Sequence, residues 1–564
     1  MSNTTPFPDL LHAVRDRRGL ALFLGALGLE PAEDVVPPET WAAYGLRDTP
    51  VTAVVVAGRS GPLEALLLEI GAGCVDRAGW LARRVRARNP ARLHLFVVAE
   101  PGYGRLVLGT FGLDGAFRRI TLERGRLRAS DLDALEEMTP QNGERGLELA
   151  LRFARALDRS RVTRAFFRDF RGRREAVAEA WTGAPGEMER ERAQLALLFL
   201  SRLTFLYFLQ RRGVLAGDDR YLVRLFGRWA GEAGGPPSSF YRARLQPLFF
   251  GALNRRPGDR DAGARALGEL PYLNGGLFER HALERRFPDL DLPDAEVRAC
   301  LDDLLERYRF TAREDDGADH AVDPEILGRV FEGLMAPGER GDTGSFYTPA
   351  PVVNRVVREA VTAYVAGSAA PAEVRAVVEG RGAAVPAPVR HRVRRRLERV
   401  RVLDPACGSG AFLLGALQRL TTAVTGLSHR PPGAVRREVV RRSLHGVDLL
   451  DDAALLCALR LWLALSSDGD EVRPLPNLDR RIRQGDALVD PLDLEHMDRG
   501  PGWQPLRDPG LRRALRVLPA AARDYVDSGP GRREAARARV RNAEMRVARA
   551  WVRGLLAAQR QRIR

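Results

Sequence analysis

The residues best suited to chemistry lie between positions 404 and 410, where two closely spaced glycines follow an acid. Asp404 ends a short aliphatic run at 400–403, Gly408 and Gly410 come after it, and residues 411–420 have a helix-compatible composition. This pattern predicts a strand, a tight loop and a helix. Because glycine lacks a Cβ and adopts positive φ, a ligand can approach the backbone closely at the carboxyl end of the strand. The segment therefore predicts a small-molecule site.

The spacing of the glycines argues against a dinucleotide ligand. The dinucleotide fingerprint requires a third glycine or alanine three residues after the second, and Leu413 stands there. The fingerprint also requires an acid roughly 20 residues further on, and the sequence has none at that place. NAD is therefore disfavoured.

Two further acids follow downstream. A second predicted strand ends at Asp448, and a carboxylate at a strand end can accept hydrogen bonds from both hydroxyls of a ribose. Capping of the next helix is the competing interpretation, although Asp451 or Asp452 fits that role better. Asp486 lies in the segment 482–488, where an ordinary acid in a turn is the alternative.

These segments resemble the amino-methylating, S-adenosylmethionine-dependent DNA methyltransferases. Residues 344–349 are similar to motif X of that family, 404–413 to motif I, 444–448 to motif II and 482–488 to motif III. The four segments also occur in the family's order and spacing. The resemblance implies a Rossmann-like core that binds S-adenosyl-L-methionine.

The resemblance assigns a role to each loop: residues 344–349 near the methionine end of the cofactor, the glycine loop around its methionyl part, Asp448 on the ribose and Asp486 on the adenine. The cationic sulfonium suits an acid-rimmed pocket without a phosphate-cradling lysine. No metal ligand is implied. The cofactor-binding residues implied are Tyr347, Thr348, Pro349, Asp404, Ala406, Gly408, Gly410, Phe412, Asp448, Asp486 and Ala487.

The region before the methyltransferase motifs is predicted to be helical. Apolar residues spaced by three and four at 195–209 predict a buried helix. Residues 206–213, 271–278 and 323–332 look like the helical region that precedes the methylase in type IIG and phage-defence adenine methylases. We assign this region a scaffold role and no chemistry.

The first 145 residues predict a small α/β domain with strands at 51–56, 66–70, 93–98 and 105–108. In restriction-modification enzymes that also cleave DNA, this position often carries a nuclease built on an Asp and a Glu-x-Lys. The best candidates are Asp48 and the tripeptide 69–71. Because the chain contains no lysine, the nuclease site is incomplete, and a degenerate nuclease-like or DNA-positioning domain is predicted.

The motif that holds the target amine is absent. Amine methylation normally needs an (Asn/Asp/Ser)-Pro-Pro-aromatic loop, which positions the nitrogen and stacks on a flipped base. The Pro-Pro pairs at 37, 236 and 431 have the wrong neighbours and positions. The last segment is instead a basic, helical tail, for which a half-buried helix, DNA contact and docking on a separate C-terminal polypeptide are alternatives.

Composition fits a DNA-associated protein. All 89 basic residues are arginine and the formal charge is +16, which suits a polyanionic partner. The four scattered cysteines form no zinc or disulfide pattern. The apolar run at 195–209 is expected to be too short to span a bilayer, so no membrane association and a cytoplasmic location are expected.

We therefore predict an α/β protein with an incomplete Rossmann-like methyltransferase core (336–490), preceded by a small α/β domain (1–145) and a helical domain (146–335) and followed by a basic tail (491–564). The predicted function is site-specific adenine methylation of double-stranded DNA in a restriction-modification or phage-defence system. No catalytic residue is assigned, and activity is expected to require a C-terminal part carrying the amine-holding motif and target recognition. The alternatives are a non-catalytic DNA-binding or assembly subunit with a vestigial cofactor fold, and a methylase of protein glutamine or RNA.

Overall fold

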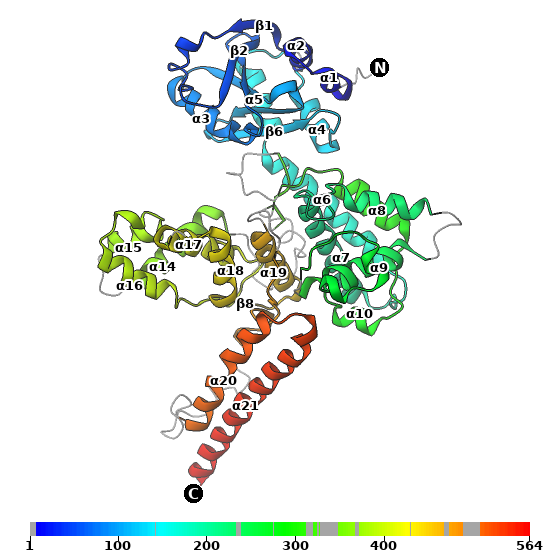
Figure 1. Ribbon diagram of the computed structural model, residues 1–564, viewed down its shortest axis with the longest axis vertical. Helices are drawn as coiled ribbons and strands as arrows, with labels where there is room; N and C mark the ends of the chain where they lie inside the picture. Colours follow the sequence, from blue (N-terminus) through cyan, green and yellow to red (C-terminus); the bar gives the residue numbers. More distant parts are fainter. Residues whose placement is uncertain are drawn as a thin grey trace. The chain divides into compact units, whose positions relative to one another are not determined.

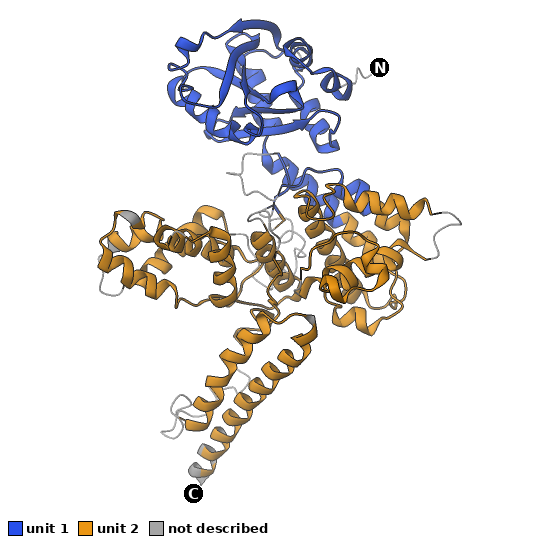
Figure 2. Cartoon of the chain, in the orientation of Figure 1, with its two compact units in different colours: residues 1–171, 299–326 blue, residues 172–298, 327–564 orange. Residues whose placement is uncertain are grey.

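The structure is a computed structural model that divides into two compact units, which are described separately (Figure 2). Unit 1 comprises Met1–Arg171 with Ala299–Ile326, and unit 2 comprises Gly172–Arg298 with Leu327–Arg564. The domain boundaries expected after 145, 335 and 490 stay predictions. The residues that the structure describes are 7–141, 143–232, 238–273, 276–311, 320–323, 326–327, 348–366, 371–428, 430–466, 473–488 and 508–563.

Unit 1 contains one six-stranded sheet (Figure 1). Its strands lie side by side in chain order: β1 (Glu30–Val35), β2 (Val51–Ser60), β3 (Leu63–Ile70), β4 (Leu93–Ala99), β5 (Arg105–Phe111) and β6 (Phe117–Glu123). Its helices are α1 (Phe7–Ala13), α2 (Arg17–Ala26), α3 (Ala78–Arg88), α4 (Ala129–Met138), α5 (Leu147–Ala156) and the first part of α6 (Arg159–Ala180). Neighbouring strands are antiparallel except β3 and β4, which are parallel and connected through α3.

Both faces of this sheet are covered. Alternate residues of β3 point to opposite faces, so Leu67 packs in one core with Phe23 and Phe153, while Leu66 packs in the other with Leu81 of α3. A strand that is buried on both faces has a nearly continuous apolar sequence, as β2 and β3 do. This continuity made the central strands predictable.

The four predicted strands of the N-terminal region are confirmed as β2, β3, β4 and β5, whereas β1 and β6 were not predicted. β1 contains Pro31 and three acids, residue types that are depleted in strands. It lies at the edge of the sheet, where proline and charge are tolerated because one row of backbone groups needs no partner. Propensity alone therefore misses it.

Unit 2 begins with a helical part. Its helices are α7 (Glu189–Gln210), α8 (Tyr221–Ala230), α9 (Ala262–Arg265), α10 (Ala282–Arg286) and α11 (Asp294–Ala299), with single π-helical turns at 241–245 and 247–253. α7 is buried continuously from Leu195 to Gln210. The prediction of a buried helix is confirmed. With 22 residues, α7 extends beyond the apolar run at 195–209 and is long and apolar enough to cross a membrane, although 89% of its most apolar window is buried in the protein, as in a core helix.

A buried ion pair joins α7 to α10, and the same arginine also donates to the segment before α10. The Arg202 guanidinium contacts both carboxylate oxygens of Glu284, at 2.6 and 3.1 Å, and donates to the carbonyls of Leu277 and Glu279 at 2.6 and 2.8 Å. Burial opposes ionisation of Glu284, but the adjacent Arg202 more than offsets it, so the pKa of Glu284 is lowered. This pair fixes Glu279 in place.

The second part of unit 2 is a small parallel sheet with helices around it (Figure 1). The strands are β7 (Val402–Asp404), β8 (Leu444–Asp448) and β9 (Ile482–Gln484), in that order. The helices are α14 (Ala350–Ala366), α15 (Pro371–Val378), α16 (Ala387–Leu397), α17 (Ala411–Ser428), α18 (Pro432–Arg442), α19 (Asp451–Ser466), α20 (Pro509–Val526) and α21 (Pro530–Ile563).

The helices between the strands bring the carboxyl ends of all three strands to one edge. α17 and α18 connect β7 to β8, and α19 lies between β8 and β9. Because the three strands are parallel, the residues that follow each of them meet at the same edge. The predicted order of strand, loop and helix at 400–420, and of strand and helix at 444–465, is confirmed.

Candidate functional site

The glycine loop follows β7 directly. Gly408 and Gly410 have φ values of 52° and 89°, in the left-handed region. A Cβ on Gly410 would lie 2.7 Å from the Cys457 sulfur, so no larger residue fits there without a shift. A Cβ on Gly408 would meet nothing within 4 Å, so the backbone faces open space at this residue. The loop is therefore packed at one glycine and accessible at the other.

Asp404 lies at the start of this loop with only one of its carboxylate oxygens paired. The Ala406 backbone N–H donates to Oδ1 at 3.2 Å, whereas Oδ2 is buried and accepts no hydrogen bond from the described residues. Burial raises the pKa of Asp404; the Ala406 N–H opposes this rise, and the charge of Asp448 adds to it. A buried acceptor without a donor costs free energy, so the site is suited to a cationic or hydrogen-bond-donating ligand.

Asp448, at the end of β8, joins the second strand to the glycine loop. Its Oδ2 accepts from the Gly408 N–H at 2.7 Å and its Oδ1 accepts from the Leu450 N–H at 3.0 Å. The Cys407 N–H donates to the Val447 carbonyl at 2.9 Å. Each carboxylate oxygen can accept a second hydrogen bond. Asp448 therefore holds the loop and keeps capacity for ligand hydroxyls.

Asp486 and Ala487 follow β9 and are exposed. The Asp486 Oδ1 accepts from the Leu488 N–H at 2.9 Å, which forms a local turn. The Gly485 N–H donates to the Asp448 carbonyl at 2.8 Å. This bond joins the two strand ends and brings Asp486 to the edge that carries Asp404 and Asp448.

The predicted motif X residues are only partly described. Tyr347 lies outside the described residues, and Thr348 and Pro349 directly precede α14. Pro349 accepts backbone hydrogen bonds from the first turn of α14, which packs against α17. Among the described residues, no hydrogen bond joins Thr348 or Pro349 to the glycine loop. Phe412 is half-buried in the first turn of α17.

Arg460 contacts the glycine loop and was not predicted from the sequence. It lies on α19 with 7% of its surface exposed, and its Nη1 donates to both the carbonyl and the hydroxyl of Ser409 at 2.9 Å. Ser409 itself is 1% exposed. The available signal was one arginine within the otherwise apolar run of α19. Arg460 therefore positions the glycine loop through Ser409.

Cys407 and Cys457 are buried beside the loop without a chemical role. A hydrogen bond to Cys407 and burial both raise the pKa of the Cys457 thiol, so this thiol stays protonated. A protonated, buried thiol is a poor nucleophile. The two side chains act as packing groups under Gly410.

A cavity of about 450 Å³ lies beside the ends of β8 and β9 in unit 2. Its lining includes Asp451, Gln484 and Trp462, and also Gln194 and His281 from the helical part. Burial lowers the pKa of His281. Asp451 and Gln484 lie within three residues of Asp448 and Asp486 in the sequence, so the cavity adjoins the acidic edge of the sheet.

The nuclease candidates in unit 1 do not form a metal site. Glu69 forms a bidentate ion pair with Arg17 at 3.0 and 2.9 Å and also accepts from the Tyr103 hydroxyl. The hydrogen bonds from Arg17 lower the pKa of Glu69. Asp48 is exposed in the loop before β2, and Gly71 follows β3. No group of three or more potential His, Cys, Asp or Glu ligands occurs in the part of the chain that the structure describes.

Comparison with known proteins points to one class of enzyme. Residues 386–473 match the family model for "MmeI, DNA-methyltransferase domain". The chain is 27% identical over 396 residues to a Methanocaldococcus jannaschii protein named as a type II restriction enzyme and methyltransferase, covering 64% of this chain and 32% of the relative. It is 22% identical over 285 residues to DNA methyltransferase A of Bacillus subtilis, covering 49% of this chain and 28% of the relative. The chain spans about a third of the length of these relatives or less.

Two solved structures show looser likenesses. One is the type IIL restriction-modification enzyme MmeI in complex with DNA, at 16% identity and a TM-score of 0.37, with 58% of this chain and 40% of that chain covered. The other is a DrdV–DNA complex, at 14% identity and a TM-score of 0.27, with 86% and 40% covered. These scores are too low to add to the argument. The family match, which contains the glycine loop and Asp448, and the two curated relatives show that this chain is similar to DNA methyltransferases, one of which is also named as a restriction enzyme.

Proposed function

We propose that this chain binds S-adenosyl-L-methionine and forms the cofactor-holding part of a site-specific adenine DNA methyltransferase in a restriction-modification or phage-defence system. Its substrate is the exocyclic amine of an adenine flipped out of double-stranded DNA. Residues 336–490 supply the N-terminal half of a Rossmann-like methyltransferase domain. The regions 1–145, 146–335 and 491–564 serve as a degenerate nuclease-like domain, a helical scaffold and a basic tail.

The observation that carries the proposal is the buried oxygen of Asp404, which accepts no hydrogen bond from the described residues and lies next to a glycine loop with open space over Gly408. The amino acid part of S-adenosylmethionine carries an ammonium group, which is a donor and a cation. Its placement against Asp404 satisfies the buried acceptor and neutralises the carboxylate. The open backbone at Gly408 leaves room for the rest of the methionyl chain.

The other loops hold the nucleoside part. We assign the ribose hydroxyls to Asp448 and the adenine amine to Asp486, with Ala487 against the ring. Tyr347, Thr348 and Pro349 are assigned to the methionine end, and Ala406, Gly410 and Phe412 shape the loop around it. The bound cofactor supplies an electrophilic methyl group. The contribution of this chain is to bind and orient the cofactor.

The chain is proposed not to transfer the methyl group by itself. No (Asn/Asp/Ser)-Pro-Pro-aromatic tetrapeptide occurs in its sequence, so nothing holds the amine with its lone pair toward the methyl group. The N-terminal domain is proposed not to cleave DNA, because Arg17 pairs with Glu69 and Gly71 occupies the expected lysine position. A polypeptide that supplies the tetrapeptide and target recognition completes the enzyme.

The test uses radiolabelled S-adenosylmethionine and plasmid DNA. The chain alone should bind the cofactor without labelling the DNA, and it should not nick the plasmid in the presence of Mg²⁺. Addition of a separate polypeptide carrying the Asn-Pro-Pro-aromatic loop should yield N6-methyladenine on digestion and chromatography. Labelling of DNA by the chain alone would refute the assignment of the missing step, and labelled cytosine would refute adenine specificity.

A further inference from the structure

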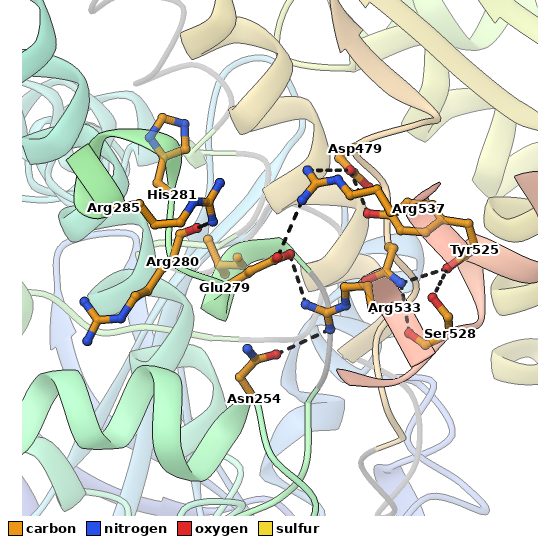
Figure 3. A network of polar contacts seen from close by, with 12 residues as sticks. Asn254, Glu279, Arg280, His281, Arg285, Asp479, Tyr525, Ser528, Arg533 and Arg537 are labelled. Atoms are coloured by element: carbon orange, nitrogen blue, oxygen red, sulfur yellow. Dashed lines mark hydrogen bonds and ion pairs between the residues drawn. The ribbon is translucent and has the colours of Figure 1, made fainter. Parts of the chain in front are cut away.

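The two long C-terminal helices are anchored at their base. The Asn477 side chain donates to the carbonyls of Tyr525 and Ser528, at 2.9 and 3.0 Å, where α20 turns into α21. At the start of α21, Arg533 donates to Glu279 at 3.0 Å (Figure 3). Arg537 also approaches Glu279, at 3.7 Å. The base of the hairpin is therefore bonded to both the helical part and the sheet part of unit 2.

A second anchor lies further along α21. Glu544 accepts from Arg480 at 2.7 and 2.6 Å and from Arg483 at 2.8 Å. Arg483 belongs to β9, the strand that leads to Asp486. The first half of α21 is thus fixed to the sheet that carries the cofactor loops.

Five arginines follow one side of α21 at intervals of seven residues. Seven residues are nearly two helical turns, so these side chains follow one side of the helix with a drift of about 20° per step. Neighbours are about 10.5 Å apart along the axis, and the first and last are about 42 Å apart. All five are exposed. This arginine stripe consists of Arg532, Arg539, Arg546, Arg553 and Arg560.

Pairing within the hairpin does not account for the stripe. Arg539 forms an ion pair with Asp524 of α20, and both side chains are more than half exposed. The α20 residues one and two heptads before Asp524 are Val517 and Gly510, neither of which carries a charge. Among the described residues, Arg539 is the stripe member with a carboxylate partner.

We propose that the arginine stripe binds the phosphate backbone of double-stranded DNA, with the anchored hairpin holding that DNA at a fixed position relative to the cofactor site. The inference rests on the proposed function and names the surface that contacts the substrate. A regular row of exposed guanidinium groups, of which Arg539 pairs with a carboxylate among the described residues, complements a regular row of phosphates, which arginine binds bidentately. The exposed apolar residues Met545 and Val552 each directly precede a stripe arginine and so lie about 100° around α21 from it.

The test measures binding of a fluorescent duplex of about 30 base pairs as a function of salt. The triple variant Arg546→Gln, Arg553→Gln, Arg560→Gln should reduce the slope of log K against log salt by about 2.7, because each lost phosphate contact removes about 0.9. Between 50 and 200 mM salt, the affinity of the variant should therefore fall about 40-fold less than that of the wild type. The effect should not depend on DNA sequence.

A matched control removes three exposed arginines outside the stripe, by Arg395→Gln in α16, Arg399→Gln after it and Arg541→Gln on another side of α21. This control has the same net charge as the stripe variant and should keep the wild-type slope. Equal slopes for both triple variants, or an unchanged slope for the stripe variant, would overturn the proposal. Binding of poly-glutamate that is as tight as DNA binding and is lost in the stripe variant would also overturn the proposal, because it would indicate an acidic protein partner. Titration with S-adenosylmethionine separates the DNA-binding role of the stripe from the proposed cofactor-binding function. The stripe variant should bind the cofactor normally. Failure of the wild type to bind it would refute the cofactor-binding function and not the DNA-binding role.

Discussion

Replacement of Arg460 by methionine removes both hydrogen bonds from α19 to Ser409 while keeping a long apolar side chain. Hydrogen bonds to a charged donor contribute about 1.5–3 kcal/mol each, and here one Nη1 serves both acceptors. We therefore expect about 2–3 kcal/mol less stabilisation of the ordered glycine loop. If that ordering accompanies cofactor binding, the affinity for S-adenosylmethionine should fall roughly 30- to 150-fold.

The assay is calorimetric titration with S-adenosylmethionine, with thermal unfolding in parallel. The matched control is Arg436→Met, which removes an arginine bonded to the carbonyl of Ala464 at the other end of α19. It should bind the cofactor like the wild type. Arg460→Lys keeps the charge and a donor nitrogen on a different side-chain geometry, and it should give an intermediate affinity. An affinity for Arg460→Met within about threefold of the wild type, or an equal loss in the Arg436 control, would refute the positioning role.

Three further predictions concern the loop and the core. Gly410→Ala places a Cβ on a residue with left-handed φ and within 2.7 Å of the Cys457 sulfur, which should strain the loop by roughly 2–5 kcal/mol. Cofactor binding should weaken at least tenfold. Adding Cys457→Ala should recover part of the loss in a double-mutant cycle. Because burial raises the pKa of Asp404, the affinity for the cofactor should be lost as pH falls through that pKa, at a higher pH than for an ordinary aspartate. The unliganded protein should gain stability as pH falls over the same range, because its folded state binds the proton more tightly than the unfolded state. The Asp404→Asn variant should show neither pH dependence. Arg202→Met leaves the Glu284 carboxylate without its cationic partner in the core and should destabilise unit 2 by about 3–5 kcal/mol in thermal unfolding. The double variant Arg202→Met, Glu284→Leu should be closer to the wild type. Equal losses in both variants would show that the unpaired charge is not the cause.

Local sequence patterns predicted the elements around the glycine loop. The aliphatic runs before Asp404 and Asp448 mark strands, and Gly408 and Gly410 mark the turn between strand and helix. Each signal lies within a few residues, so it can be identified without knowledge of the tertiary structure. The parallel order of the strands then brings the two acids to one edge.

Contacts between distant residues could not be predicted in this way. The bond from Gly408 to Asp448 joins residues 40 positions apart, and the bond from Arg460 to Ser409 joins residues 51 positions apart. The Arg17–Glu69 pair, 52 positions apart, likewise needs the folded sheet of unit 1. No local pattern shows which arginine of an arginine-rich chain will reach a given carboxylate or carbonyl.

Calorimetric titration of the purified chain with S-adenosyl-L-methionine tests the central claim most directly. We expect saturable binding of one cofactor per chain, with strongly reduced affinity in the Asp404→Asn variant, because the buried Oδ2 then no longer offers an anionic acceptor. Absence of binding by the folded wild-type chain would show that the site around Asp404 does not hold the cofactor. The glycine loop would then belong to a vestigial cofactor fold in a DNA-binding or assembly subunit.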